Sequence, residues 1–254
     1  DPYGGRADLE AGILRAVGDA HERFGEDALR LMRAVRFATT LDFAIENDTL
    51  KALVEYAPSI AGISVERVRD EFTKIMNSPG AYQGVQLLED TGLMQFIIPE
   101  LREGIGVDQN LHHIYTVWEH NLRTLKYAAQ KNYSFVVRMA CLLHDVGKPR
   151  TKRGKGRHCT FYAHDAVGGT MAQAIMERMR FPSETAQKVA LLVRYHMFYY
   201  NVGEVTESSV RRLIANVGRE NIEDLLRLRE GDRIGSGTPK AVPYKLRHLK
   251  YMIA

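Results

Sequence analysis

The chain has few of the residues and patterns that mark a specialised class of protein. Only two of its 254 residues are cysteines, Cys141 and Cys159, and their spacing fits neither a disulfide framework nor a metal site. A reducing compartment, the cytoplasm, is therefore expected. No apolar run approaches the roughly 20 residues that a membrane-spanning helix needs. No signal peptide is recognisable either, so no membrane partner is expected.

Alternating patterns typical of β-strands are scarce too. Almost every segment instead repeats apolar residues three to four positions apart, which is typical of amphipathic helices. Helices are expected at residues 24–41, 48–57, 64–76 and 81–92, and near 115–130, 134–145, 163–180, 183–198, 206–217 and 219–233. We therefore predict an all-α fold.

Local signals mark the ends of several of these helices. Asp48 is expected to cap the second helix and Ser64 the third. Gly92 is expected as the C-terminal cap of the fourth. A proline and three glycines predict a loop for "GKPRTKRGKGRH", residues 147–158. Its basic side chains would either be solvated or contact phosphate or RNA.

The residues that are present form an ordinary globular composition with a mild basic excess. Hydrophobic residues make up 45% and charged residues 26%, with a formal net charge of +4. This charge is compatible with phosphate-rich partners but does not require them. A Gly-rich stretch separates two sets of helices, so we predict domains at residues 1–104 and 105–254. The chain begins without Met and ends within an apparent helix, so both ends are expected to be cuts through a longer sequence.

The most specific chemical pattern is a set of histidines and aspartates. His144 and Asp145 are adjacent in "LLHDVGKP", His120 lies upstream, and Asp232 lies far downstream in "EGDRIGSG". Imidazoles and carboxylates together can hold a divalent metal that keeps water positions open. A lone His–Asp pair at a helix end is more often a structural hydrogen bond. The remote residues shift the balance toward a metal, although a helical scaffold without activity stays open.

This pattern resembles the HD phosphohydrolase superfamily, in which H…HD…D is accompanied by a lysine soon after the pair, here Lys148. The resemblance implies one or two divalent metals (Mg²⁺, Mn²⁺ or Ni²⁺) that activate water against phosphate esters. It implies catalytic roles for His144, Asp145 and Lys148. The implied metal ligands are His120, His144, Asp145, His164, His196 and Asp232, of which His164 and His196 would complete a second site.

A second pattern lies in "EDALRLMRAVRF", where two acids are followed only by arginines. Arg30, Arg33 and Arg36 recur at every third position. On one helix, Asp27 and Arg30 would be neighbours one turn apart. A carboxylate that accepts and a guanidinium that donates can match the edge of C or A, whereas G and U present the wrong order. The alternative is a surface ion pair worth roughly 0.2–0.5 kcal/mol.

Together with "DPYGGRADL" and "LDFAI", this segment resembles the class II family of tRNA nucleotidyltransferases and bacterial poly(A) polymerases. Its CCA-adding branch builds the 3′ end of tRNA from CTP and ATP. The resemblance implies a helical neck and body at 1–104, with 1–10 a remnant of the head connection, and an HD domain at 105–254. It implies that Asp27 and Arg30 select the nucleotide and that Arg33 and Arg36 contact it. The partner would be tRNA, and a homodimer is left open.

The paired carboxylates that hold Mg²⁺ for nucleotidyl transfer in this family have no counterpart here, because the chain contains no D-x-D motif. The head domain is expected upstream of Asp1, so this chain alone should add no nucleotide. Two other functions remain open. One is a self-standing HD phosphohydrolase acting on 2′,3′-cyclic or 2′-phosphates of RNA ends, and the other is a non-catalytic RNA-binding module. Whether the parent adds CCA, A alone or CC alone is not encoded in this segment.

Overall fold

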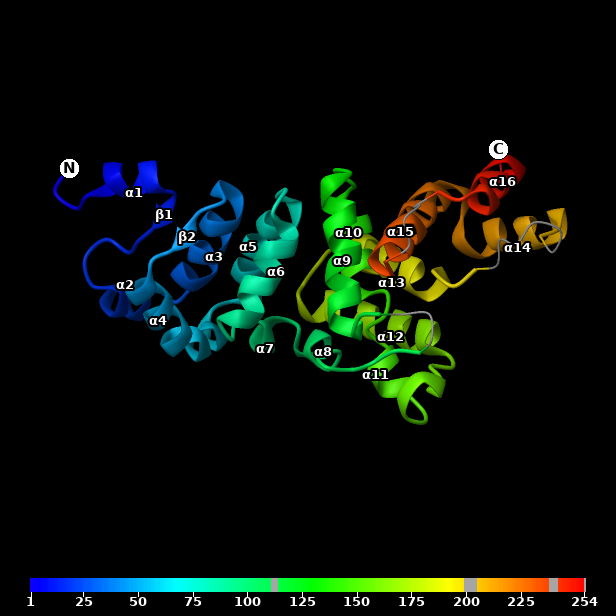
Figure 1. The fold of residues 1–254 in the computed structure, drawn as a ribbon, viewed down its shortest axis with the longest axis horizontal. Helices are drawn as coiled ribbons and strands as arrows, with labels where there is room; N and C mark the ends of the chain where they lie inside the picture. The colour runs from blue at the N-terminus through cyan, green and yellow to red at the C-terminus, as the bar shows by residue number, and fades with distance from the viewer. Residues whose placement is uncertain (111–113, 199–204, 238–241, 254) are drawn as a thin grey trace. The chain divides into compact units, whose positions relative to one another are not determined.

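The fold is helical throughout the part of the chain that is described. The computed structural model describes residues 1–110, 114–198, 205–237 and 242–253. Over these residues it contains helices and one pair of two-residue strands, so the all-α prediction is confirmed (Figure 1). No helix within these ranges is long and apolar enough to cross a membrane.

The chain divides into two compact units. The first consists of Asp1–Arg102 with Arg178–Phe181, and the second of Glu103–Glu177 with Pro182–Ala254. Each unit has its own set of fully buried apolar side chains, among them Phe72 in the first and Leu125 in the second. Each unit therefore has a hydrophobic core of its own.

The first unit is built around α3. Its elements are α1 (Gly5–Ala11), β1 (Ile13–Leu14), α2 (Ala20–Glu26), α3 (Leu29–Leu41), β2 (Ala44–Ile45), α4 (Asn47–Tyr56), the 3₁₀ helix η1 (Ala57–Gly62), α5 (Val65–Asn77), α6 (Ala81–Asp90), α7 (Met94–Ile97) and α8 (Pro99–Arg102). The strands β1 and β2 pair in parallel. Helix α3 packs against α5 and α6 and fully buries Leu31, Met32 and Val35.

The single helix predicted at 24–41 is wrong, because the chain is interrupted at Asp27. Helix α2 ends at Glu26, Asp27 is extended (φ −150°, ψ 105°), and α3 begins at Leu29. The Asp27 Oδ1 accepts a hydrogen bond from the Leu29 backbone N–H at 3.0 Å. An aspartate that bonds to nearby backbone in this way competes with the helix. Asp27 and Arg30 therefore do not share one continuous helix.

The predicted helix ends are correct at some positions and wrong at others. Ser64 directly precedes α5, and Gly92, with φ 76°, follows the end of α6, as expected. Asp48 does not cap α4. The cap is Glu46, whose carboxylate accepts from the backbone N–H groups of Asp48 and Thr49, because its longer side chain reaches back over the first turn.

The second unit has its core between α9, α10, α13 and α15, which pack against one another. Its elements are α9 (Val117–Gln130), α10 (Phe135–Leu143), α11 (Lys148–Thr151), the 3₁₀ helix η2 (Gly156–His158), α12 (His164–Arg178), α13 (Ser183–Tyr195), α14 (Glu207–Val217), the 3₁₀ helix η3 (Arg219–Asn221), α15 (Ile222–Gly235) and α16 (Tyr244–Ile253). The helices predicted in this half are present with shifted ends.

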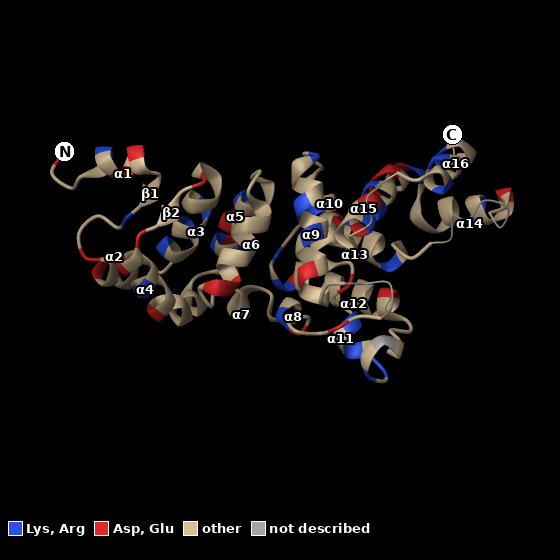
Figure 2. Ribbon diagram, viewed as in Figure 1, with Lys and Arg blue, Asp and Glu red and all other residues tan. Residues whose placement is uncertain are grey.

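The basic stretch 147–158 is more ordered than the predicted loop. Pro149 lies in the first turn of α11, where a missing N–H is tolerated, so it begins a helix instead of preventing one. Arg153 and Thr160 then exchange two backbone hydrogen bonds of 2.9 Å. Figure 2 shows blue Lys and Arg segments along α11 and the ribbon that follows it.

A buried ion pair joins α3 to α5 in the first unit. Arg36 Nε lies 2.5 Å from Oε2 of Glu71, and Lys74 Nζ lies 2.8 Å from its Oε1. The Glu71 side chain is 8% exposed. Burial opposes ionisation of Glu71, but Lys74 and Arg36 outweigh it and lower the pKa of this carboxyl group. Arg36, predicted to face a nucleotide, thus has a structural partner.

Replacing Glu71 by Gln is expected to lower the free energy of unfolding at pH 7 by about 1–3 kcal/mol, because it leaves Arg36 without its carboxylate. The depressed pKa makes this contribution complete above the usual glutamate value of 4.5 and lost as the pH falls through the lowered value. Urea denaturation at pH 7 and at lower pH measures the difference. Glu66→Gln, an exposed change on the same helix, is the control. Equal unfolding energies for Glu71→Gln and the unchanged chain would contradict the prediction.

Candidate metal and nucleotide sites

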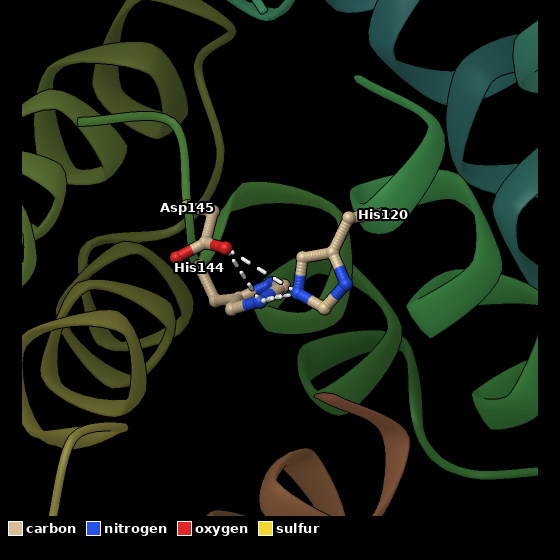
Figure 3. A group of neighbouring side chains, drawn as sticks. All are labelled: His120, His144 and Asp145. Atoms are coloured by element: carbon tan, nitrogen blue, oxygen red, sulfur yellow. Dashed lines mark hydrogen bonds and ion pairs between the residues drawn. The ribbon is translucent and has the colours of Figure 1, made fainter. Parts of the chain in front are cut away.

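Four buried side chains converge in the core of the second unit. His120 comes from α9, His144 and Asp145 from the end of α10, and Asp232 from α15. The His120 Nε2 lies 2.9 Å from Nε2 of His144, 3.3 Å from Oδ2 of Asp145 and 3.2 Å from Oδ1 of Asp232. Figure 3 shows the side chains of His120, His144 and Asp145 pointing toward one another.

The Asp145 carboxylate stands between two groups of ring nitrogens. Its Oδ2 lies 3.4 Å from Nε2 of His144, while its Oδ1 lies 3.4 Å from Nε2 of His164 and 3.6 Å from Nε2 of His196. Within each group the donor atoms lie within 4.8 Å of one another. The structure therefore brings all six predicted metal ligands to one centre, with Asp145 shared between two halves.

Three of the histidines are oriented by the same kind of hydrogen bond to the local backbone. The Nδ1 atoms of His144, His164 and His196 each face the backbone carbonyl three residues earlier, at 2.9, 2.8 and 2.7 Å. A carbonyl oxygen can only accept, so each Nδ1 carries the ring proton. In the neutral ring this leaves the Nε2 lone pair directed into the centre, as a metal ligand requires.

Burial keeps the rings of His144 and His164 neutral at ordinary pH. It lowers the pKa of His144 to about 3 and also lowers that of His164. The Nε2 atom of His164 is buried and has no hydrogen-bond partner among the described residues. A buried lone pair without a partner is costly, and a cation between the two groups would satisfy it. The donor set, with four imidazoles and two carboxylates, thus fits one or two divalent metals.

Two cations keep the carboxylates ionised. Lys148 Nζ donates to Oδ2 of Asp145 at 2.6 Å and to Oε1 of Gln109 at 2.6 Å. Arg229 forms an ion pair with Asp232. Burial opposes ionisation of both carboxyl groups, but Lys148 at Asp145 and Arg229 at Asp232 outweigh it, so each pKa lies well below its usual range. Sequence reasoning missed Gln109 and Arg229, although Arg229 stands one helical turn before Asp232.

Glycines allow the helices that carry these ligands to approach closely. A Cβ on Gly235 of α15 would lie 2.2 Å from Oγ1 of Thr124 on α9, so only glycine lets Asp232 reach His120. A Cβ on Gly147, in the turn after Asp145, would lie 2.3 Å from the backbone oxygen of His164. The turn that follows the His–Asp pair is therefore pressed directly against the start of α12.

The predicted nucleotide-binding residues of the first unit have other partners in the structure. Asp27 Oδ2 lies 3.3 Å from Arg67 on α5, a residue that sequence reasoning missed within "SVERVRDEF". Arg30 forms an ion pair with Glu26 and donates to the Arg23 carbonyl at 2.9 Å. The structure therefore does not bring Asp27 and Arg30 together as a side-chain pair.

A pocket of about 270 Å³ lies beside this segment in the first unit. Four arginines line it, together with aromatic and small side chains: Arg15, Arg23, Arg30 and Arg33. Arg15 binds Asp8 through two nitrogens, at 2.8 and 3.1 Å. Asp27 and Arg36 lie outside the lining. The pocket thus unites two of the four predicted residues with two further arginines, and its charge suits a polyphosphate.

Comparisons with known domain families match most of the chain. Residues 42–105 match the family described as "Probable RNA and SrmB- binding site of polymerase A", and residues 117–230 match the HD domain. The second match includes His120, His144 and Asp145 and ends before Asp232. The RNA-binding match begins after α3 and ends at the start of the second unit.

Curated relatives carry tRNA-related names. An A-adding tRNA nucleotidyltransferase of Deinococcus radiodurans is 36% identical over the whole chain, and 59% of the relative is covered. Multifunctional CCA proteins of Neisseria meningitidis and Pseudomonas aeruginosa are 33% and 34% identical over 84% of the chain, with 51% and 53% of each relative covered. The chain thus spans between half and three fifths of the length of these relatives.

Solved structures have the same fold. The Bacillus stearothermophilus CCA-adding enzyme in complex with CTP superposes with a TM-score of 0.60 at 25% identity, over 99% of this chain and 53% of that chain. A structure named tRNA-processing enzyme complex 3 also reaches 0.60, at 17% identity, over 96% of this chain and 60% of that one. The second likeness concerns the fold alone.

Gly147→Ala is expected to lower the free energy of unfolding by about 1–3 kcal/mol, because the added methyl group collides with backbone that cannot move independently. It should also weaken metal binding, since the displaced part of α12 begins with His164. Urea denaturation and metal content of the purified chain, supplied with Mn²⁺, measure the two effects. Gly62→Ala is the control, because a Cβ there meets nothing within 4 Å. Unchanged stability together with unchanged metal content would refute the prediction.

Proposed function

We propose that this chain belongs to the family of tRNA nucleotidyltransferases and poly(A) polymerases, and that it forms the nucleotide-selecting and RNA-binding part of an enzyme that adds C and A to the 3′ end of tRNA. The observation that carries the proposal is 36% identity over the whole chain to an A-adding tRNA nucleotidyltransferase. The substrates would be CTP and ATP, the partner tRNA and the compartment the cytoplasm. The Mg²⁺ ions of nucleotidyl transfer would be held outside these 254 residues, which contain no D-x-D motif.

Asp27 and Arg30 remain our proposed selectors of the incoming base. Each is held by a partly exposed ion pair, Asp27 with Arg67 and Arg30 with Glu26. Exposed pairs of this kind contribute little to stability, so a bound base can replace the partner of each at little cost. Arg33, Arg15 and the rest of the arginine pocket would then receive the triphosphate. Arg36 is the weakest member of the proposed set, because Glu71 already binds it.

We propose a second function for the same chain, a metal-dependent phosphohydrolase of the HD type. The supporting observation is the convergence of four histidine Nε2 atoms and two ionised carboxylates in one buried centre. Divalent metal held by His120, His144, Asp145, His164, His196 and Asp232 would activate water and polarise a phosphate ester there. The substrates would be 2′,3′-cyclic or 2′-phosphates of RNA ends.

Chain residues would assist this hydrolysis in defined ways. Water oxygen bonds to phosphorus, one P–O bond to the ribose breaks, and the water proton ends on the released ribose oxygen. Lys148, hydrogen-bonded to Asp145, would hold that carboxylate in place and place positive charge beside the phosphate. Gln109 fixes Lys148 from the other side.

In the complete enzyme, Asp27→Ala or Arg30→Ala is expected to relax the selection of C and A by roughly ten- to a hundredfold, because a paired base contact contributes about 1–3 kcal/mol of discrimination. Incorporation of each of the four nucleoside triphosphates into tRNA lacking its 3′ end measures the effect. Asp48→Ala, a change to an exposed side chain bound to Lys51, is the control. Undiminished preference for C and A in both variants would rule out the selector role.

His144→Ala and Asp145→Ala are each expected to remove bound metal and hydrolysis of 2′,3′-cyclic AMP, because both side chains belong to the shared centre. Metal content after incubation with Mg²⁺, Mn²⁺ or Ni²⁺, and product formation, are measured beside a circular dichroism spectrum of each variant. His21→Ala is the control, since His21 is a half-exposed histidine of the first unit. Turnover that persists in both folded variants would exclude this centre as the site of hydrolysis.

A further inference from the structure

The His–Asp centre opens into a pocket much larger than a phosphate group requires. The pocket has a volume of about 630 Å³, within the range of sites that bind small organic ligands. One part of its wall is formed by Asp145, His164, His196 and Asp232 of the centre. The other part carries Asn110, Thr160, Tyr162, Met197, Arg233 and Ser236. A second group of atoms can therefore bind beside the phosphate.

Tyr162 is the large aromatic residue at the open side of this pocket. Its side chain is 78% exposed although it lines the cavity, whereas the neighbouring Phe161 is 8% exposed and faces Lys148 Nζ at 5.6 Å from the ring centroid. An exposed tyrosine that borders a cavity offers a flat apolar face to a ligand. Exposed aromatic side chains are common on protein surfaces, so exposure alone does not indicate a binding role for Tyr162. The backbone contacts that fix its position indicate one more strongly.

The backbone on both sides of Tyr162 is held in place. Before it, Thr160 exchanges two hydrogen bonds of 2.9 Å with Arg153. After it, Ala163 adopts a left-handed conformation (φ 59°), which a residue with a Cβ rarely takes up unless its surroundings hold it there. The next residue, His164, is anchored through its Nδ1 to the Phe161 carbonyl at 2.8 Å. This turn directs His164 into the centre and leaves Tyr162 at the mouth.

Two arginines in the lining of the pocket supply positive charge. Arg229 and Arg233 lie one turn apart on α15 and flank Asp232, and both line the pocket. Arg229 forms an ion pair with Asp232, and Arg233 adds positive charge to the same part of the lining. The pocket thus combines a metal-type centre, an arginine and an aromatic face.

We infer that Tyr162 determines the substrate of the HD centre by stacking on the base of a nucleotide whose ribose phosphate lies at the His–Asp centre and against Arg233. The inference rests on the proposed phosphohydrolase function and names its substrate class. Every base has a flat π-face, so stacking on tyrosine favours nucleotides over small phosphate esters without selecting one base. A free 2′,3′-cyclic nucleotide and the cyclic end of an RNA share this chemistry.

The test compares Tyr162→Ala with Tyr162→Phe and with Tyr251→Ala. Tyr251 is 81% exposed on α16 and lies outside the pocket lining, which makes it a matched control. The substrates are 2′,3′-cyclic AMP, a short RNA with a 2′,3′-cyclic end, and glycerol 1,2-cyclic phosphate, which has the same phosphate ring without a base. Binding of 2′-AMP to each variant, with and without Mn²⁺, is measured by calorimetry as a readout that does not depend on turnover.

Tyr162→Ala is expected to raise KM for 2′,3′-cyclic AMP and to weaken 2′-AMP binding by roughly ten- to a hundredfold. The kcat values and the hydrolysis of glycerol 1,2-cyclic phosphate should stay within about twofold. Tyr162→Phe should retain the affinity, because the ring remains, and Tyr251→Ala should match the unchanged chain. A larger loss on the RNA than on the mononucleotide identifies an RNA end as the natural substrate, and an equal loss identifies free nucleotides.

Equal KM values and equal 2′-AMP affinities for Tyr162→Ala and the unchanged chain overturn the inference. So does an unchanged chain that binds no 2′-AMP, or one that hydrolyses both cyclic phosphates with the same KM. Failure of the phosphohydrolase function looks different, because none of the three substrates is then turned over. The calorimetric comparison still decides on Tyr162 in that case.

Discussion

The buried carboxylate of Asp145 is the group on which the second unit depends most. It lies in the core of a helical unit, where an ion without partners would be strongly disfavoured. Lys148 makes its ionisation favourable, and its two oxygens divide the histidines into two groups. Helices α9, α10, α12, α13 and α15 all contribute a side chain, a cap or a close backbone contact to this centre. The same helix packing that forms the core of the unit therefore also brings charged and polar partners to the Asp145 carboxylate.

In the first unit most of the described ion pairs lie at the surface, unlike the buried charges around Asp145. Its arginines are paired with acids at the surface, as in Arg15 with Asp8 and Arg30 with Glu26, while Arg36 and Glu71 pair in the interior. The exposed pairs are weak and can be exchanged for a ligand, whereas the interior pair holds α3 against α5. One row of arginines, spaced evenly in the sequence, thus contains residues with opposite roles. The difference lies in the acidic partner, because the partner of Arg36, Glu71, is buried and the partner of Arg30, Glu26, is exposed.

Much of the fold and of the candidate metal centre can be predicted from the sequence, because both depend on residue patterns that are visible in the sequence itself. Apolar spacing of three to four residues predicts the helices, and His120 and Asp232 together with the His144–Asp145 pair make the ligand pattern specific. The six candidate ligands indeed meet, although only His144 and Asp145 are neighbours in the sequence. What they bind stays a prediction.

The predictions from the sequence are wrong where a single local hydrogen bond or a contact with a distant residue determines the local structure. The break at Asp27 depends on one side-chain bond to the Leu29 N–H, which the apolar spacing of the segment conceals. The partner of Asp27 is Arg67, forty positions away in the sequence and on another helix. Pro149 is compatible with α11 because it lies in the first turn of this helix, where its missing N–H would have no partner within the helix. Such contacts have no periodic signal in the sequence.

Both candidate sites are suited to nucleotide phosphates, yet they reach this by opposite distributions of charge. The pocket of the first unit is lined by guanidinium groups and can attract a triphosphate directly. The centre of the second unit carries two ionised carboxylates, each with a cation beside it, Lys148 at Asp145 and Arg229 at Asp232. Arg233 adds further positive charge to the lining of the pocket. A divalent cation at the centre would add positive charge to a site whose own charges are already paired, which is why the proposed hydrolysis depends on a metal.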